Sequence, residues 1–427
     1  MCSENQNPRP WRTFIRGDKV LKIAIVDLIT LTTVPSNTAI SFVGLLPKGR
    51  PYKESELNIV ELAEAISRIG NDVTVYVSDA YLPEIPSKPK PNLHVEYLPT
   101  RLKWIFSPGM IPFTPALFHR IRKGHYDIVL STDLFQWGTI ISALASIGRN
   151  KSHVVIWQEA DVYSFSAINR LVQWFFYHTF GKLVVSLVDG FVSRTTVAEE
   201  FLVTLGIPHS KLLGVIPSGV NTDVFRPLSD GDALRRKLHI KSTNRVVTCV
   251  TTLYHDRGLD LLIRAMREVV NEIPEAKLLI RGRGPLKATL DAIINNLGLE
   301  RSVSIIGDYF AREELCALLN ISDVVVVIFR WYGFLPFSAL ESIACGKPVI
   351  SASERRLRGL RDFIKDDTTG FLVGYEVEDI SQKIKFMVKN PARSKEMGHN
   401  ALELCRRTCD MRLVAERFVD LFRRLVS

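Results

Sequence analysis

The chain has 427 residues, of which 46% are hydrophobic and 23% are charged. This length exceeds what one ordinary hydrophobic core accommodates, so two domains are expected, and the balanced composition excludes disordered, collagen-like and coiled-coil classes. Lys and Arg outnumber Asp and Glu by 55 to 45, giving a net charge of +10, which favours anionic partners such as nucleic acid, phosphorylated small molecules or an acidic membrane.

The first half of the chain alternates short β-branched runs with amphipathic helical segments. Leu21–Val26 is the first predicted strand, and Ser55 is the predicted N-cap of a helix that ends at Gly70. A second helix is expected over Gly138–Ile147. The other predicted strands of this half are Val73–Val77, Ile128–Leu130, Val154–Trp157, Gly190–Ser193 and Leu213–Ile216. This alternation predicts crossover connections and a parallel sheet.

The alternation breaks at Ile216–Pro227, whose proline, glycine, asparagine and aspartate residues predict a hinge. The strands predicted after it are Val246–Val250, Lys277–Ile280, Val303–Ile306, Val324–Ile328, Pro348–Ile350 and Gly370–Val373. The helices predicted between them are Leu259–Val270, Leu286–Leu297, Arg312–Asn320 and Phe337–Ala344. Two doubly wound domains with a cleft between them are therefore expected, with the last helix, Met411–Val426, packing back across the cleft.

The six cysteines indicate reduced thiols rather than a disulfide framework. Only Cys405 and Cys409 are close in sequence, and no histidine lies near them at metal-ligand spacing. The first 18 residues lack the apolar region of a signal peptide, and runs such as Val324–Phe329 are much shorter than a spanning helix. A cytoplasmic location is expected, with peripheral attachment to the cytoplasmic membrane face left open.

The Arg281-Gly282-Arg283-Gly284-Pro285 segment directly follows a predicted strand and opens a helix. Glycines at such a turn let the backbone approach a phosphate, and free amides at a helix start favour an anion. The third glycine of a dinucleotide-binding loop is missing. Tight strand–helix turns also use glycine for packing, so both interpretations stay open.

Two further residues are candidates for ligand contacts. Glu341 lies in the mostly apolar segment Phe337–Ala344, where an unpaired carboxylate is costly. A ribose diol suits it, because a carboxylate accepts two hydroxyl protons, but an ion pair with a buried arginine explains it equally well. Arg257 precedes a predicted helix at the carboxyl edge of the sheet, where a cation meets a diphosphate; a solvated arginine is the favoured alternative from this residue alone.

These segments, in this order and spacing, resemble the GT-B-fold glycosyltransferases of the retaining family 4 type, or glycosyl transferases group 1. The resemblance is specific over residues 190 to 390, approximately, and compatible in pattern before them. The segments that carry it are Ile216–Asn221, Phe225–Pro227, Arg257–Asp260, Gly282–Pro285, Asp323 with the strand after it, Leu340–Ile350 and Thr369–Val373.

The resemblance implies an α/β fold of the GT-B type, in which two Rossmann-like doubly wound domains face a central cleft. Residues 1–220 are then the acceptor domain, residues 221–410 the donor domain, and residues 411–427 a helix that crosses back. The implied activity is a hexosyltransferase that moves a sugar, with retention, from a nucleotide diphosphate sugar to an acceptor.

The resemblance also implies roles for residues of the donor domain. By analogy, Glu341 binds the ribose hydroxyls, and Arg257 faces the diphosphate with the amides of Phe337 and Ser338. The turn formed by Gly282, Arg283, Gly284 and Pro285 shapes the nucleotide floor. Electrostatic stabilisation of the leaving diphosphate then carries much of the catalysis, with no cofactor and no metal required.

The sequence departs from the family pattern in four places. Gly333 stands where the family has a second glutamate, and Thr252 stands where it has an arginine. A histidine of the N-terminal domain is replaced by the Gln158–Asp161 region, and the Gly-Gly loop after the first strand is missing, with Gly44 and Gly49 as nearby candidates. A variant site, with Arg281, Arg283 or Arg330 supplying the lost cation, is favoured over a decayed one.

Two segments of the N-terminal half combine cations and aromatic residues without any acidic residue: Arg101–Tyr126 and Val162–Val188. Such surfaces suit an anionic bilayer and a lipid-linked acceptor, such as a polyprenyl phosphate or a lipid-linked saccharide. The alternative is that Leu171–Leu187 is a core helix. Nucleic acid is disfavoured because no recognition motif accompanies the charge.

Three other functions are weighed against glycosyl transfer. A non-catalytic scaffold that binds a partner glycosyltransferase agrees with the missing glutamate and histidine. A sugar-nucleotide 2-epimerase needs acid and base residues that are not evident near Gly282 or Glu341. A nicotinamide-dependent oxidoreductase is disfavoured because no Gly-x-Gly-x-x-Gly follows Leu21–Val26.

Overall fold

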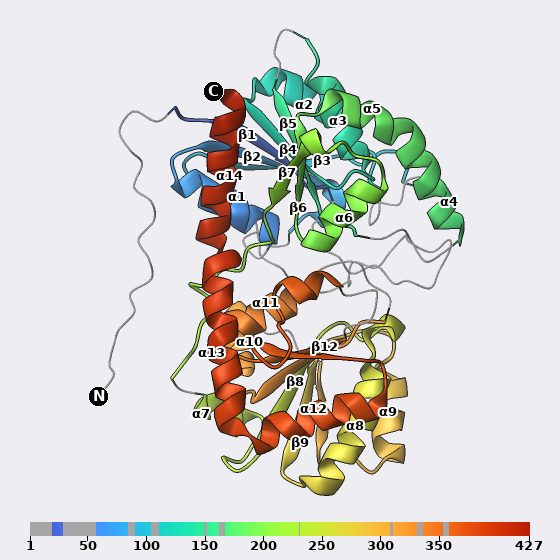
Figure 1. Cartoon of the computed structure of the whole chain (residues 1–427), viewed down its shortest axis with the longest axis vertical. Coiled ribbons are helices and arrows are strands. Elements are labelled where there is room, and N and C mark those ends of the chain that lie inside the picture. The colour runs from blue at the N-terminus through green and yellow to red at the C-terminus, as the bar shows by residue number, and fades with distance from the viewer. Residues whose placement is uncertain are drawn as a thin grey trace.

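The computed structural model describes residues 19–28, 57–83, 90–103, 111–148, 152–161, 167–229, 231–307, 311–330, 336–352 and 358–427. Two α/β domains lie one above the other along the long axis of the molecule (Figure 1). The predicted N-cap Ser55 lies outside the described residues, as do Gly44, Gly49 and Gly333.

The N-terminal domain is built on a seven-stranded parallel sheet in the order β3-β2-β1-β4-β5-β6-β7. Ile23 of the central strand β1 pairs in register with Val73 of β2 and Ile128 of β4. The strands are β1 Lys22–Val26, β2 Asp72–Ser78, β3 Leu93–Leu98, β4 Ile128–Thr132, β5 His153–Gln158, β6 Gly190–Ser193 and β7 Leu212–Val215. Strand β3 was not expected from the sequence, because its side chains at this sheet edge are mostly only partly buried.

Helices cover both faces of this sheet. Helix α1 (Asn58–Arg68) and the last helix, α14 (Met411–Val426), pack on one face. The other face carries α2 Ala116–Gly124, α3 Trp137–Ala145, α4 Ala167–Phe176, α5 Lys182–Leu187 and α6 Thr196–Thr204. The aromatic segment expected to be one helix is interrupted between α4 and α5 by a π-helical turn, Tyr177–Gly181.

The C-terminal domain is built on a six-stranded parallel sheet in the order β10-β9-β8-β11-β12-β13. Its strands are β8 Arg245–Val250, β9 Ala276–Arg281, β10 Val303–Ile306, β11 Val324–Val327, β12 Val349–Ala352 and β13 Gly370–Val373. Its helices are α7 Asp232–Lys237, α8 Leu259–Glu272, α9 Lys287–Asn296, α10 Arg312–Asn320, α11 Phe337–Ala344, α12 Val377–Lys389 and α13 Pro391–Thr408. Both sheets have the doubly wound α/β arrangement expected from the sequence.

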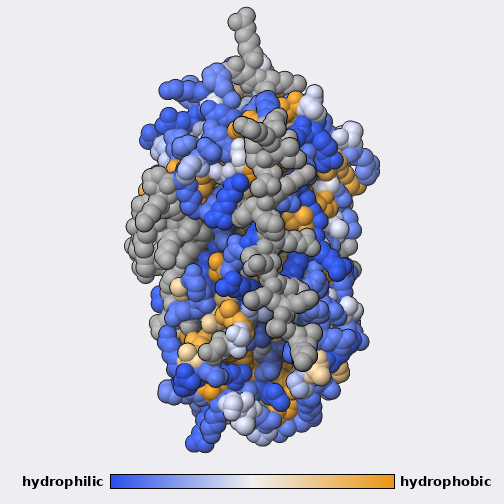
Figure 2. Space-filling model, turned by 90° about the vertical axis from the view of Figure 1, so that its left-hand side faces the viewer, coloured by the Kyte–Doolittle hydropathy of each residue, from blue (hydrophilic) through white to orange (hydrophobic). Residues whose placement is uncertain are grey.

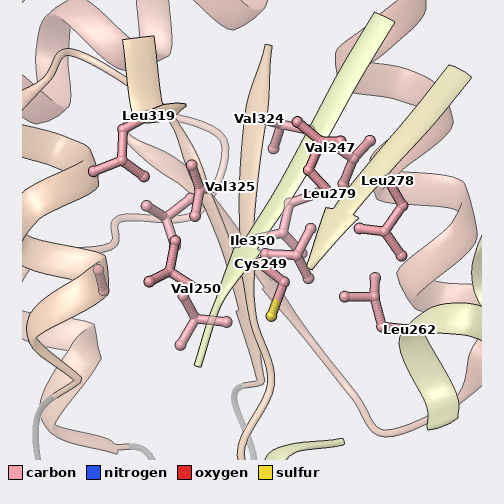
Figure 3. Packing of buried hydrophobic residues seen from close by; sticks show 14 of the residues in the cluster. Val247, Cys249, Val250, Leu262, Leu278, Leu279, Leu319, Val324, Val325 and Ile350 are labelled. Carbon is pink, nitrogen blue, oxygen red and sulfur yellow. The ribbon is translucent and has the colours of Figure 1, made fainter. Parts of the chain in front are cut away.

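The core of the C-terminal domain is built from the continuous apolar runs of its central strands. Val247, Leu278 and Val324 come from neighbouring strands and are completely buried. Leu319 of α10 and Leu262 of α8 approach the strands from two sides (Figure 3). A strand that is buried on both faces has few polar positions, which is why these strands could be recognised in the sequence.

The chain crosses between the domains twice, and the two crossings are hydrogen-bonded to each other. The Val220 amide donates to the Cys409 carbonyl at 2.8 Å, and the Met411 amide donates to the Val220 carbonyl at 3.0 Å. Gly219 is required at this crossing, because a Cβ there would lie 2.6 Å from the Met411 sulfur. The predicted hinge at Ile216–Pro227 is therefore one half of a paired connection.

Helix α14 fills the face of the N-terminal sheet that α1 leaves open (Figure 1). Its bounds, Met411–Val426, and its return across the domain boundary are as predicted. Phe418 is fully buried, with its ring centroid 5.1 Å from that of Trp157 on β5, and Phe422 lies beside it. The N-terminal core is therefore completed by the C-terminal end of the chain.

The described cysteines, Cys249, Cys316, Cys345, Cys405 and Cys409, are all buried and free. Within the described ranges, no helix is both long and apolar enough to span a bilayer.

Replacement of Phe418 by alanine tests the role of α14. The substitution leaves a cavity against Trp157 and is expected to lower the free energy of unfolding by about 3–5 kcal/mol. Urea unfolding followed by tryptophan fluorescence measures this. Arg424→Ala, at an exposed position of the same helix, is the control and is expected to change stability by less than about 0.5 kcal/mol. Equal effects of the two substitutions would contradict the packing role of α14.

Candidate functional site

The loops that leave β8, β9 and β11 form one connected surface at the carboxyl edge of the second sheet. The Thr251 amide donates to the Arg281 carbonyl at 3.0 Å, and the Leu253 amide donates to the Arg283 carbonyl at 2.9 Å. The Arg330 amide donates to the Asp256 carbonyl at 2.7 Å. The structure therefore brings the Arg257 segment, the glycine turn and the end of β11 together, at the edge where parallel sheets bind ligands.

The two glycines of the turn after β9 are needed for packing. A Cβ at Gly282 would lie 1.7 Å from the Thr251 carbonyl oxygen, and one at Gly284 would lie 2.4 Å from that of Leu253. The packing interpretation of these glycines therefore has a direct steric basis. Between and beyond them, Arg283 and Pro285 are exposed, and Arg283 Nε donates to the Gly307 carbonyl. The turn thus presents an exposed, cationic surface at the edge of the sheet.

Arg257 is buried, although it stands at the end of a loop. Its guanidinium lies over the Phe329 ring, 4.4 Å from the centroid, and its Nε donates to the Thr252 hydroxyl at 3.1 Å. Thr252, which departs from the family pattern, therefore holds Arg257 in place. Asp256 Oδ1 is 3.7 Å from Arg257 Nε. Burial raises the pKa of Asp256, and Arg257 counteracts that rise.

Helix α11 begins at this edge with an N-cap residue whose side chain does not cap the helix amides. Its N-cap is Pro336, which has no side-chain hydrogen bond to the helix, and Phe337 and Ser338 in the first turn are partly exposed. Backbone amides at a helix start carry partial positive charge and bind anions. Glu341 lies four residues after Phe337 and three after Ser338, on the same face of the helix. One helical turn thus combines an anion-binding end with a carboxylate.

The carboxylate of Glu341 is enclosed without a partner. Among the described residues, none forms a hydrogen bond or an ion pair with it, although the side chain keeps some exposure to solvent. Burial raises the pKa of Glu341 to about 7. The cation of Arg312 opposes this rise, and the Glu61 carboxylate adds to it. None of the arginines in the described ranges forms the ion pair with Glu341 that the sequence left open as one of two explanations.

Glu61 and Arg312 join the two domains beside Glu341. Glu61 on α1 forms an ion pair with Arg312 on α10, and Arg312 also lies over the Phe225 ring, 5.1 Å from the centroid. Asn221 of the first crossing donates to Glu61 at 2.8 Å. The other carboxylate oxygen of Glu61, Oε2, is buried without a hydrogen-bond partner among the residues that the structure describes. Glu341 lies near this cluster, because Glu61 and Arg312 both shift its pKa.

The carboxyl edge of the N-terminal sheet carries a second buried pair. Arg194, after β6, donates to Glu159, after β5, at 2.7 Å, and its guanidinium lies 4.0 Å from the Trp157 ring centroid. Burial raises the pKa of Glu159 to about 7, Arg194 lowers it, and the carboxylates of Asp133 and Asp27 raise it further. Asp133 accepts the Glu159 amide at 2.9 Å. The Gln158 side chain accepts a hydrogen bond from the Leu134 amide and donates one to the Ala160 carbonyl.

The three arginines considered as replacement cations differ in their surroundings. Arg330 forms an ion pair with Asp260 at 2.8 Å, and Arg283 is bonded to the Gly307 carbonyl. Arg281 is close enough to Glu341 to lower its pKa. Of the three, Arg281 therefore lies electrostatically closest to the carboxylate.

Glu61, Arg312, Glu159 and Arg194 were not predicted as site residues from the sequence. Arg194 directly follows a predicted strand and Glu159 comes two residues after another, which is the signal that could have found them. Glu61 is one polar residue on the apolar side of a predicted helix, and its partner is 251 positions away in the chain. In the part of the chain that is described, no group of three or more His, Cys, Asp or Glu residues is arranged to hold a metal ion.

Comparison with known families matches both halves of the chain. Residues 56–224 match the model described as Glycosyltransferase Family 4, and residues 230–404 match the model described as Glycosyl transferases group 1. A GDP-mannose-dependent alpha-(1-6)-phosphatidylinositol monomannoside mannosyltransferase of Mycolicibacterium smegmatis is 33% identical over 215 residues, covering 49% of this chain and 54% of that protein. A D-inositol 3-phosphate glycosyltransferase of Rhodococcus opacus is 31% identical over 227 residues, covering 51% of this chain and 49% of that protein. The chain thus spans about half the length of these curated relatives.

Solved structures share the fold over nearly the whole chain. Sucrose-phosphate synthase from Thermosynechococcus elongatus superposes with a TM-score of 0.71 at 18% identity, covering 94% of this chain and 98% of that one. HepE from Anabaena, in complex with UDP and glucose, superposes with a TM-score of 0.67 at 17% identity over the same shares. At these identities the similarity shows the GT-B fold.

Replacement of Glu341 by glutamine tests whether its carboxylate is a buried, unpaired charge. Because the folded-state pKa is raised from the usual 4.5 to about 7, the ionised group destabilises the protein fully above pH 7 and not at all below pH 4.5. Glu341→Gln is therefore expected to raise the free energy of unfolding at about pH 8 by up to roughly 3 kcal/mol, and to have little effect at about pH 5. Denaturant unfolding at both pH values measures this. If Glu341→Gln left the free energy of unfolding unchanged at high pH, or lowered it, the carboxylate would have a stabilising partner.

Proposed function

The chain belongs to the GT-B glycosyltransferases of the Family 4 and group 1 type, and we propose that it is a nucleotide-sugar-dependent hexosyltransferase. In the proposed reaction the bond between the anomeric carbon and the diphosphate breaks, and a bond from an acceptor oxygen to that carbon forms. The acceptor loses its proton and the nucleoside diphosphate leaves. Retention of configuration at the anomeric carbon is proposed from the family resemblance.

The first turn of α11 is the single observation that carries this proposal. Its amides at Phe337 and Ser338, which the N-cap side chain does not cap, suit a diphosphate. One turn later the carboxylate of Glu341, which has no partner among the described residues, suits a ribose diol. The unfavourable burial of that carboxylate is offset when two hydroxyl groups donate to it. A site of this kind selects a ligand with an anion and a diol held a few ångströms apart, as in a nucleoside diphosphate.

The remaining donor contacts are proposed from the loops beside α11. Arg257, held by Thr252 and Phe329, stabilises the negative charge that develops on the leaving diphosphate. The exposed turn at Arg283 and Pro285 borders the nucleotide. A reaction that needs no bound metal stays a prediction of the family resemblance.

The acceptor is proposed to bind at the carboxyl edge of the N-terminal sheet, where Glu159 and Arg194 face the boundary between the domains. A saccharide or a lipid-linked saccharide is proposed, at the cytoplasmic face of a membrane. The M. smegmatis relative supports this choice, since its name specifies GDP-mannose and a phosphatidylinositol monomannoside. GDP-mannose is therefore the first donor to test, and UDP-glucose is the second.

A transfer assay with Glu341→Ala tests the proposal. Purified protein is incubated with each donor and with mannosylated or lipid-linked acceptors, and both the released nucleoside diphosphate and the glycosylated product are measured. Loss of two hydrogen bonds to a charged group is expected to lower kcat/KM by roughly 10- to 100-fold, mainly through a higher KM for the donor. Glu268→Ala, at an exposed position of α8, is the matched control and keeps wild-type transfer.

Unchanged transfer by Glu341→Ala would exclude the ribose-binding role of this residue. Donor binding without transfer to any acceptor would favour the alternative function of a non-catalytic partner subunit. Conversion of the sugar within the nucleotide sugar, without transfer, would indicate an epimerase.

A further inference from the structure

The helices on one face of the N-terminal sheet form a layer with an unusual charge distribution. On this face, α2, α3, α4 and α5 and the π-helical turn between the last two contain no Asp or Glu, whereas α6 carries Glu199 and Glu200. The cations of the acid-free helices are Arg120, Arg122, Lys123, Arg170 and Lys182, of which Arg120 forms an ion pair with Glu96 of β3 at 2.6 Å. Helix α3 packs against both α2 and α5, so these cations belong to one continuous layer.

The α4–α5 segment is apolar on both of its faces. Its inner side buries Phe176, Tyr177 and Val184 in the core of the domain. Its outer side exposes Leu171 by 66%, Phe175 by 58% and Trp174 by 50%. The bulky residues exposed on this side are Leu171, Val172, Trp174, Phe175, Phe180 and Leu183, and we call them the α4–α5 face. A helix that only covers a core is polar on its outer side. The interpretation of this segment as a core helix therefore explains its buried face but not its exposed apolar face.

The π-helical turn contributes to this outer surface. His178 stacks on Trp174, with ring centroids 4.3 Å apart, and its Nδ1 lies 2.7 Å from the Trp174 carbonyl oxygen. Thr179 donates its hydroxyl proton to the Phe175 carbonyl at 2.7 Å. These contacts turn the polar groups of His178 and Thr179 back onto the helix, so the surface beside Phe175 stays apolar.

The α4–α5 face follows the proposed acceptor edge closely in the chain. Strand β5 ends at Gln158, directly before Glu159, and α4 begins at Ala167. In Figure 1, α4 lies at the outer edge of the N-terminal domain, on the side away from α14. On the opposite side of the molecule, the surface that carries a hydropathy colour in Figure 2 is mostly hydrophilic, with scattered hydrophobic patches.

We propose that the α4–α5 face docks on an anionic lipid bilayer, with Leu171, Trp174 and Phe175 inserted among the headgroups. Arg170 and Lys182 flank these side chains and meet the anionic headgroups, while the exposed cations Arg122 and Lys123 of α2 add longer-range attraction. Exposed aromatic and aliphatic groups flanked by cations, on a segment that itself carries no carboxylate, match the boundary between headgroups and acyl chains. Docking in this way holds the carboxyl edge of β5 beside the membrane.

A second copy of the chain fits this face less well. In a two-fold symmetric interface the same patch meets itself, so the cations of the two copies would face each other without a carboxylate to pair them. An anionic bilayer supplies the complementary charge that a second copy lacks.

Vesicle binding tests the proposal with the full chain and without any nucleotide. Wild-type protein is mixed with phosphatidylcholine vesicles that contain about 30% phosphatidylglycerol, and with pure phosphatidylcholine vesicles, at low and high salt. We expect binding to the anionic vesicles that weakens at high salt. Leu171→Glu/Phe175→Glu is expected to lower partitioning at least about tenfold, and Arg170→Gln/Lys182→Gln to lower it about threefold or more.

Matched variants separate docking from general effects. Val203→Glu/Leu228→Glu makes the same charge change at exposed apolar positions elsewhere, and Arg264→Gln/Arg301→Gln removes two exposed cations of the other domain. Both are expected to bind vesicles as wild type does. Melting temperatures confirm that each variant is folded. Brominated lipids are expected to quench tryptophan fluorescence in wild type, and Trp174→Phe is expected to remove most of that quenching.

Equal binding by the Leu171→Glu/Phe175→Glu variant and wild type would overturn the proposal, as would no binding of wild type to anionic vesicles. So would a dimer in sedimentation velocity that the same variant dissociates, since the face would then bind a second copy. Vesicle binding needs no donor and no transfer, so its failure leaves the proposed glycosyltransferase activity untouched. Loss of that activity in Glu341→Ala likewise leaves vesicle binding unchanged.

Discussion

The structure depends on the return of the chain across the domain boundary. Val220 is hydrogen-bonded to the Cys409–Met411 segment, so the two connections between the domains are joined to each other. Helix α14 then covers an apolar face of the N-terminal sheet that would otherwise be exposed, with Phe418 and Phe422 completely buried. The relative position of the domains is therefore set by packing as well as by covalent linkage. Because both carboxyl edges face this boundary, the same constraint positions the candidate site.

The buried carboxylates at the domain boundary lower the stability of the fold and suit the binding of a ligand. Glu341 in the C-terminal domain and Glu159 in the N-terminal domain are both enclosed carboxylates whose pKa is raised to about 7 by burial. Glu159 is compensated by Arg194, whereas Glu341 has no partner among the described residues. Protein interiors rarely keep an uncompensated carboxylate, and sites that do so commonly bind a ligand. The ion pair of Glu61 with Arg312 gives this region a contact that exists only while the domains are together.

Much of the fold could be predicted from the sequence because its strands are buried on both faces. Helices α10, α11 and α14 have the predicted bounds, since their apolar periodicity is strong and their ends are marked. Strand β3 was missed because its partly buried side chains at the sheet edge give no clear pattern. The ion pair of Glu61 with Arg312 could not be predicted, because it depends on how the two domains meet.

The candidate site was predictable to the extent that it lies in local motifs. The segments around Arg257, Gly282 and Glu341 were identified from the sequence, and the structure places them at one edge. The sequence could not show that Gly282 and Gly284 are required by the backbone of residues 251–253, nor that Arg257 lies over Phe329. Such contacts arise from segments that meet only after the sheet has formed.

Direct measurement of nucleotide binding tests the central claim, that the second domain binds a nucleotide diphosphate sugar. Thermal unfolding is followed with UDP, GDP, ADP and their sugar conjugates, with and without a divalent metal. A ligand at about 100 times its dissociation constant adds roughly 2.7 kcal/mol to the free energy of unfolding, which is readily detected. Selective stabilisation by one nucleoside diphosphate and its sugar conjugate is expected. Absence of stabilisation by every nucleotide at millimolar concentration would contradict it.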